Sequence, residues 1–122
     1  MSHIVEIKTQ VRDAAAVQAA CRRLELSPPV HGTTKLFSAS VTGLAVQLPG
    51  WRYPVVCQLA AGEIQYDNYN GRWGAVQELD KFLQAYTVEK TKIEVRRQGL
   101  SVSEQTLADG SIKLTVQVGG AA

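Results

Sequence analysis

The 122-residue sequence lacks long hydrophobic runs: nothing beyond a few consecutive residues is uniformly apolar. A membrane-spanning helix needs about 20 apolar residues, so no transmembrane segment is predicted. The first residues, MSHIVEIK, also lack the basic start and unbroken apolar stretch of a secretory signal. We therefore expect a cytoplasmic protein that makes no membrane contact.

The sequence also has little cysteine and little excess charge. Lys and Arg number 13 against 11 Asp and Glu, and the net charge of +2 is too small to argue for nucleic acid by itself. Cys21 and Cys57 lie far apart without CxxC spacing, so we expect two buried, reduced thiols, with a disulfide as the alternative. A metal site that adds His3 and His31 has no spacing in its favour. No metal or cofactor is predicted.

Known catalytic motifs are absent as well. The sequence has no GxSxG, no P-loop, no HExxH, and no GxGxxG after a strand. His31 is a candidate general base on a loop, yet no nucleophile or carboxylate is near it in sequence. Asp67 and Asp80 could act as an acid and a base only if the fold joined them. No catalytic residue is therefore predicted, and an enzyme with a dispersed site around His31 is the least favoured hypothesis.

What is present is the composition of an ordinary globular domain. Hydrophobic residues make up 45% of the chain and charged residues 20%, far from the polar composition of disordered segments. The length fits one core. We expect a single domain over residues 1–118 and a short flexible tail, Gly-Gly-Ala-Ala, over 119–122.

The first two thirds of the chain alternate between β and α patterns. A helix over 14–25 has Asp13 as its N-cap and ends at the Ser-Pro-Pro of 27–29. The middle of the chain is predicted to be an antiparallel meander. Alternation of apolar and polar residues predicts strands over 3–12, 34–40 (weakly), 44–48, 53–59 and 63–67.

A long helix is predicted over 74–98, closed by Gly99. At about 1.5 Å per residue it would reach about 38 Å, which exceeds the width of a small domain. Its apolar stripe is dense up to Tyr86 and sparse beyond it, where charged residues dominate. We expect the second half of the helix to project or to be solvated.

The carboxyl end is predicted to be a β-hairpin. A two-residue turn at Asp-Gly 109–110 would put Leu100 and Val102 on the wrong face. A three-residue loop over 108–110, with its glycine left-handed, instead sets Val102 opposite Val116 and Leu100 opposite Val118. The predicted fold class is α+β: an antiparallel sheet of five or six strands, extended by this hairpin, with one short and one long helix on one face.

The segment over 49–74 is the most informative for function, because it concentrates both tryptophans and three of the four tyrosines. Trp, Tyr and Arg dominate binding hot spots, and here they stand on turns that a sheet could hold rigidly. The alternative is structural, with the tryptophans closing the ends of the core and the Asp and Asn residues only making turns. The candidate binding residues are Trp51, Arg52, Tyr53, Tyr69, Arg72 and Trp73.

The same residues could bind single-stranded nucleic acid, with aromatic rings stacking on bases and Arg52, Arg72 and Lys35 holding phosphates. The basic end of the long helix could contribute, but Glu89 and Glu94 interrupt it. Cations near a helix C-terminus are also explained by the helix dipole. Nucleic-acid binding is therefore disfavoured.

Four segments carry a family resemblance that spans nearly the whole chain: MSHIVEIKTQVRD, YDNYNGRWG, LDKFLQAYTVEK and QTLADGSIKLTVQV. They resemble a bacterial domain-of-unknown-function family, numbered in the twelve-hundreds, that includes a conserved plastid and cyanobacterial reading-frame protein. The aromatic segment is similar to the bacterial branch. The resemblance carries no catalytic residues. It implies an accessory role in a protein assembly beside an AAA-type ATPase, which is association and not mechanism.

The leading functional expectation is a non-enzymatic interaction module. It presents the six candidate residues to a protein partner, with an AAA-type ATPase as the partner that the resemblance implies. A small-ligand or single-stranded nucleic-acid binding domain is the alternative, and the residues leave a homo-oligomer open. We expect two neighbouring loops to bring their indole and guanidinium groups, including Trp51 and Trp73, to the surface as a single patch; burial of both indoles, or indoles that face apart, would contradict this expectation.

Overall fold

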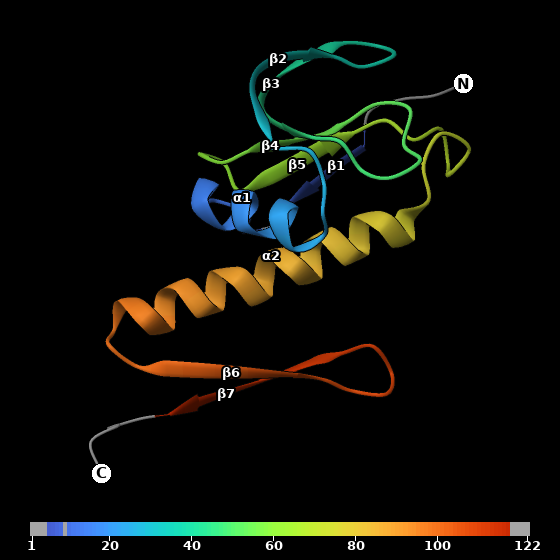
Figure 1. The fold of residues 1–122 in the computed structure, drawn as a ribbon. Coiled ribbons are helices and arrows are strands. Elements are labelled where there is room, and N and C mark those ends of the chain that lie inside the picture. Colours follow the sequence, from blue (N-terminus) through green and yellow to red (C-terminus); the bar gives the residue numbers. More distant parts are fainter. Residues whose placement is uncertain (1–4, 9, 118–122) are drawn as a thin grey trace.

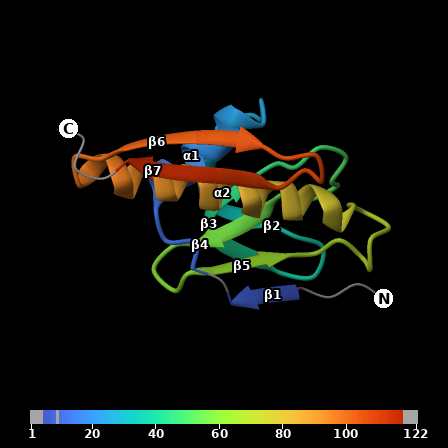
Figure 2. The ribbon, with the colours of Figure 1, turned by 90° about the horizontal axis from the view of Figure 1, so that it is seen from below.

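The computed structural model describes residues 5–8 and 10–117, and these form a sheet, a pair of helices and a hairpin in successive layers (Figure 1). Helices α1 (Ala14–Arg23) and α2 (Val76–Arg97) lie on one face of the sheet, and the hairpin lies across the far side of α2 (Figure 2). This confirms the predicted α+β class. The sheet is antiparallel in the order β1-β5-β4-β3-β2, with β1 Val5–Lys8, β2 Val30–Lys35, β3 Ser40–Val46, β4 Val55–Gln58 and β5 Glu63–Tyr66.

Helix α1 begins where its cap predicts. The Asp13 carboxylate accepts hydrogen bonds from the backbone N–H groups of Ala15 at 2.9 Å and Ala16 at 3.3 Å, which satisfies donors that the first turn leaves free. The helix ends at Arg23, two residues before the predicted end at 25. Its buried face consists of Ala16, Val17, Ala20 and Cys21.

Helix α2 packs against α1 and the hairpin, and one face of its first half is buried in the core beneath the sheet. Leu79, Phe82, Ala85 and Tyr86 are at most 5% exposed. The charged second half was predicted to project or to be solvated. This is wrong for residues 89–95, which are half-buried, whereas Arg96 and Arg97 at the end of the helix are exposed. The hairpin lies against this part of the helix (Figures 1 and 2). In the described part of the chain, no helix is long and apolar enough to cross a membrane.

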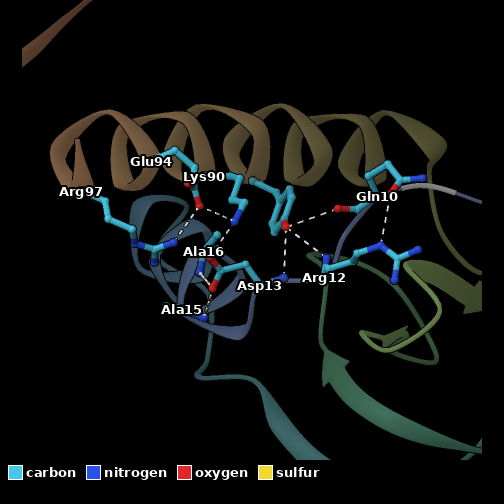
Figure 3. A network of polar contacts seen from close by, with 9 residues as sticks. Gln10, Arg12, Asp13, Ala15, Ala16, Lys90, Glu94 and Arg97 are labelled. Atoms are coloured by element: carbon cyan, nitrogen blue, oxygen red, sulfur yellow. Dashed lines mark hydrogen bonds and ion pairs between the residues drawn. The ribbon is translucent and has the colours of Figure 1, made fainter. Parts of the chain in front are cut away.

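A polar junction fixes the start of α1 to the middle of α2 (Figure 3). The Tyr86 hydroxyl accepts from the backbone N–H groups of Arg12 at 3.1 Å and Asp13 at 3.2 Å. The Lys90 ammonium bridges the carboxylates of Asp13 at 3.0 Å and Glu94 at 2.8 Å. The Lys90 hydrogen bond, followed by those from the α1 backbone, lowers the pKa of Asp13. The cap of one helix is thereby also an anchor for the other.

The β2-β3 hairpin differs from its prediction. Residues 34–40 do not form one strand: β2 ends at Lys35 and the chain turns over 36–39, where the Leu36 N–H donates to the Ala39 carbonyl at 2.8 Å. Leu36 is buried under the turn, whereas Phe37 is 54% exposed. The apolar residues that suggested a strand therefore belong to a turn packed on the sheet. Figure 1 shows this turn on the side of the sheet away from the helices.

The C-terminal hairpin, β6 (Ser101–Thr106) and β7 (Ile112–Gln117), has the predicted loop. Val102 lies opposite Val116, and the Leu107 N–H donates to the Ser111 carbonyl at 2.8 Å, which leaves three loop residues. Gly110 is left-handed at φ 89°. The prediction is confirmed for these residues. The predicted pairing with Val118 and the tail over 119–122 lie outside the described residues.

This hairpin was predicted to extend the main sheet, and this is wrong: it forms a separate two-stranded sheet. Its strands are two-faced. One face carries the half-buried Val102, Ile112 and Leu114, while the other is polar and exposed. An apolar face of this kind is removed from water by packing on a helix, which edge-to-edge pairing would not achieve. The polar face consists of Ser101, Ser103, Gln105, Lys113, Thr115 and Gln117.

Ion pairs join the hairpin to both helices. The Arg23 guanidinium bonds Glu104 of β6 at 2.8 Å and Glu89 of α2 at 3.1 Å, and the Lys92 ammonium bonds Glu104 at 3.2 Å. The Arg23 hydrogen bond, with further help from Lys92, lowers the pKa of Glu104 to about 2. Glu104 is therefore the carboxylate through which acid acts on the docked hairpin.

We predict that acid loosens the hairpin before it unfolds the sheet. The pKa of Glu104 is lowered in the fold. Its contribution to the stability of the docked hairpin is therefore complete above the ordinary pKa of 4.5 and disappears as the pH falls through about 2. Amide hydrogen exchange measured across this range should show protection lost in β6 and β7 first. Glu104→Gln should lack that pH step, whereas Glu25→Gln, which removes an exposed carboxylate without an ion pair in the described part of the chain, should keep it. Simultaneous loss of protection in both sheets would contradict the prediction.

Candidate functional site

Three loops meet at one end of the molecule and bring together a surface group of aromatic and arginine side chains. The loops are the β2-β3 turn over 36–39, the β3-β4 connection over 47–54 and the β5-α2 connection over 67–75. All six side chains are exposed or partly exposed. We call them the aromatic-arginine cluster: Phe37, Arg52, Tyr53, Tyr69, Arg72 and Trp73.

Trp73 is the centre of this cluster. Its ring centroid lies 4.9 Å from that of Tyr69, 5.2 Å from Phe37 and 5.6 Å from Tyr53. The rings are inclined to Trp73 by 53° to 70°, in the tilted and edge-on arrangements that aromatic pairs prefer. Each loop thus contributes at least one ring to a single packed group.

Both arginines of the cluster stack on these rings. The Arg52 guanidinium lies 4.8 Å from the Trp73 ring centre and 5.6 Å from that of Tyr53, and the Arg72 guanidinium lies 5.1 Å from that of Tyr69. Among the described residues neither guanidinium has a carboxylate partner. The only acidic residue of the three loops is Asp67, which is fully buried. The exposed charge of the cluster is therefore entirely positive.

The β5-α2 loop is held in shape by its own backbone. The Asn68 carbonyl accepts from the N–H groups of Gly71 at 3.0 Å and Trp73 at 2.9 Å, and the Asn68 side-chain amide donates to the Gly74 carbonyl at 3.1 Å. Asn68 is only 8% exposed, so this clamp is shielded from water. The tight turn runs through three successive left-handed residues: Tyr69, Asn70 and Gly71, at φ 47°, 53° and 92°.

Trp51 does not belong to the exposed cluster, which corrects the expectation that both indoles lie together at the surface. It is 4% exposed, its ring meets Tyr66 edge-on at 5.4 Å, and its indole N–H donates to the Ala75 carbonyl at 3.0 Å. The ring lies flat against Gly74, where an added Cβ would stand 2.3 Å from the indole. Trp51 is a core residue, as the structural alternative proposed for it.

Trp51 nevertheless helps to form the site. It holds the β3-β4 connection against the β5-α2 loop, and beside it the Arg52 backbone N–H donates to the Trp73 carbonyl at 2.8 Å. These bonds bring the loop that carries Arg52 and Tyr53 to the loop that carries Trp73. The structure thus joins five of the six predicted binding residues and places the sixth underneath them.

Phe37 is the member of the cluster that the sequence reasoning missed. It was counted within the predicted strand over 34–40, so its exposure on a turn was not foreseen. The available signal was the Phe-Ser-Ala at 37–39, where a large ring precedes two small residues that suit a turn.

His31 was predicted on a loop, and this is wrong: it lies in β2, where with Leu44, Cys57 and Gln58 it helps to line a separate hollow of about 460 Å³. This volume falls in the range of small-ligand sites, about 300–1,000 Å³. No carboxylate lines it. Burial, followed by the nearby Cys21, raises the pKa of Cys57 to about 12, so its thiol is protonated at neutral pH. The hypothesis of a dispersed site around His31 gains neither an ionised thiol nor a carboxylate from these residues.

The remaining titratable candidates differ in their burial. Asp67 is fully buried, while Asp80 is exposed on α2. Cys21 and Cys57 are both buried and free, as predicted. Among residues 5–8 and 10–117, no three His, Cys, Asp or Glu side chains form a group that could hold a metal ion, and His3 lies outside the described residues.

We predict that the two tryptophans differ in their effect on stability. Trp51→Ala removes a buried ring with its hydrogen bond and should cost about 4 kcal/mol, whereas Trp73→Ala should cost about 1 kcal/mol. Trp51→Phe, which keeps a ring without the donor, should fall between them. Urea unfolding followed by far-ultraviolet circular dichroism measures each value. Equal losses from Trp51→Ala and Trp73→Ala would contradict the assignment of Trp51 to the core.

Comparisons with known proteins leave the family open. No protein-family model, no curated protein and no solved structure matches the chain. The resemblance described from the sequence therefore stays a prediction, and the functional argument rests on the residues of the site.

Proposed function

We propose that this protein is a non-enzymatic interaction module that binds a protein partner through the aromatic-arginine cluster. One observation carries the proposal. A partly exposed Trp, two partly exposed Tyr, an exposed Phe and two exposed Arg converge from three loops onto one surface, and the arginines have no carboxylate partner in the described part of the chain. Such residues contribute most of the binding free energy at protein interfaces.

The cluster is also organised before any partner arrives. The backbone clamp at Asn68 and the Arg52 to Trp73 hydrogen bond fix the loops, and the rings restrict one another by contact. Binding through fixed side chains loses less conformational entropy than binding through mobile ones, so more of the contact energy remains as affinity. This fixed geometry favours a recognition surface rather than a group of rings that only covers the core.

The candidate partner is an AAA-type ATPase, for which this protein would be an accessory subunit. The support for this choice is the sequence resemblance, not the geometry of the cluster. A small ligand or a single-stranded nucleic acid on the same surface is the alternative class, and the experiment below separates the three.

The proposal predicts contact with a partner at Phe37 and not at a matched site elsewhere. Replacing Phe37 by the photoreactive analogue benzoylphenylalanine keeps a similar ring at a position that is 54% exposed. Irradiation in the native host should yield a discrete covalent adduct with one protein, identified by mass spectrometry. An ATPase in that adduct would support the specific partner.

The matched control carries the same group at Leu107, which is 40% exposed on the hairpin loop outside the cluster. The Leu107 variant should give no such adduct, and Trp73→Ala should abolish the adduct formed at Phe37. Identical adducts at both positions, or a Phe37 adduct that survives Trp73→Ala, would reject the cluster as the binding surface. Crosslinking to nucleic acid alone would favour the alternative class.

A further inference from the structure

We infer that the aromatic-arginine cluster recognises an acidic segment of its partner that presents carboxylates together with an apolar side chain. This deepens the proposed function and rests on it. The juxtaposition that carries the inference is two unneutralised guanidiniums on the rings of one cluster, Arg52 over Trp73 and Arg72 over Tyr69, with the exposed Phe37 beside Trp73.

The two arginines of the cluster have no ion pair among the described residues. Elsewhere in the described part of the chain, Arg22, Lys35, Arg96 and Lys113 also lack an ion pair, whereas Arg23, Lys90 and Lys92 each bond two carboxylates. Arg52 and Arg72 differ from these because they lie on loops whose only acid, Asp67, is fully buried. Two exposed positive charges without neighbouring acids favour a negatively charged partner.

The N–H donors of both arginines remain available for hydrogen bonds to a partner. Each guanidinium lies over a ring, 4.8 Å from Trp73 for Arg52 and 5.1 Å from Tyr69 for Arg72. A cation–π contact of this kind does not itself use the N–H donors of the guanidinium in hydrogen bonds to an acceptor. No hydrogen bond from either side chain occurs among the described residues. Both arginines can therefore donate to a carboxylate in the bidentate manner without leaving their rings.

The arrangement of the rings favours an acidic peptide over single-stranded nucleic acid as the ligand. Binding without sequence preference to a single strand uses exposed ring faces on which bases stack. Here Trp73 is contacted by three rings and by the Arg52 guanidinium, and Tyr69 by Trp73 and the Arg72 guanidinium. Both rings are only partly exposed. The groups most open to a partner are the exposed Arg52, Arg72 and Phe37, which suit carboxylates and an apolar side chain.

A peptide selection tests the inference. Random peptides displayed on phage are selected on the immobilised full chain, and those that also bind the Trp73→Ala variant are discarded. We expect the retained peptides to be enriched in Asp and Glu around an apolar residue. Synthetic copies should bind wild type at least about ten-fold more tightly than Arg52→Gln/Arg72→Gln, because each variant loses charge-assisted hydrogen bonds.

The matched control is Arg22→Gln/Arg96→Gln. It removes the same charge at two exposed arginines near helix ends, outside the three loops. Unchanged affinity of this control shows that the effect belongs to the cluster and not to net charge. Equal weakening by both double variants would overturn the inference, since it would mean that the peptides respond only to overall charge.

The remaining outcomes separate this inference from the proposed function. Retained peptides without acidic enrichment, or with equal affinity for wild type and Arg52→Gln/Arg72→Gln, would overturn the inference while the cluster stays a protein-binding surface. A labelled single-stranded oligonucleotide that displaces the peptides, with affinity falling steeply in salt, would overturn it in favour of nucleic acid. Failure to retain any peptide that depends on Trp73, together with no adduct at Phe37, would reject both.

Discussion

The surface of this protein depends on one packed contact, the indole of Trp51 lying on Gly74. Only a residue without a Cβ fits there, and the indole N–H reaches the Ala75 carbonyl at the entrance of α2. The contact therefore joins two connections that are distant in sequence and fixes both at the end of the long helix. The rings and guanidiniums above it can form one cluster because the loops beneath them cannot separate without opening the core.

Charge is used in two different ways at the two ends of α2. Toward its C-terminus, Arg23 and Lys92 neutralise Glu104 and hold the hairpin. Beyond its N-terminus, Arg52 and Arg72 lie on aromatic rings and have no acidic partner among the described residues. Exposed ion pairs contribute modestly to stability, so the first set mainly positions the hairpin. The second set keeps its donors available, which is the physical basis for assigning recognition to that end of the molecule.

The aromatic concentration in the sequence predicted a recognition surface but could not distinguish its members. Trp51 and Trp73 look equivalent in sequence, since each lies in a glycine-containing loop beside an arginine. Their burial differs because the Trp51 indole packs on Gly74, where no Cβ obstructs it, whereas Trp73 follows the left-handed turn through Asn70 and stays partly exposed. Phe37 joins the cluster from a third loop, a contact between residues 36 positions apart that no local pattern encodes.

The features that the sequence by itself determined are local. Asp13 caps α1 through its own next residues, and the alternation of β6 and β7 with Gly110 sets the hairpin register, because both depend on interactions within a few residues or across one turn. Tertiary structure alone decided that the hairpin covers α2 and that the charged half of that helix is half-buried. It also decided which indole is sealed inside. Those outcomes depend on which apolar faces pack together, and the local sequence of one face does not specify the face against which it packs.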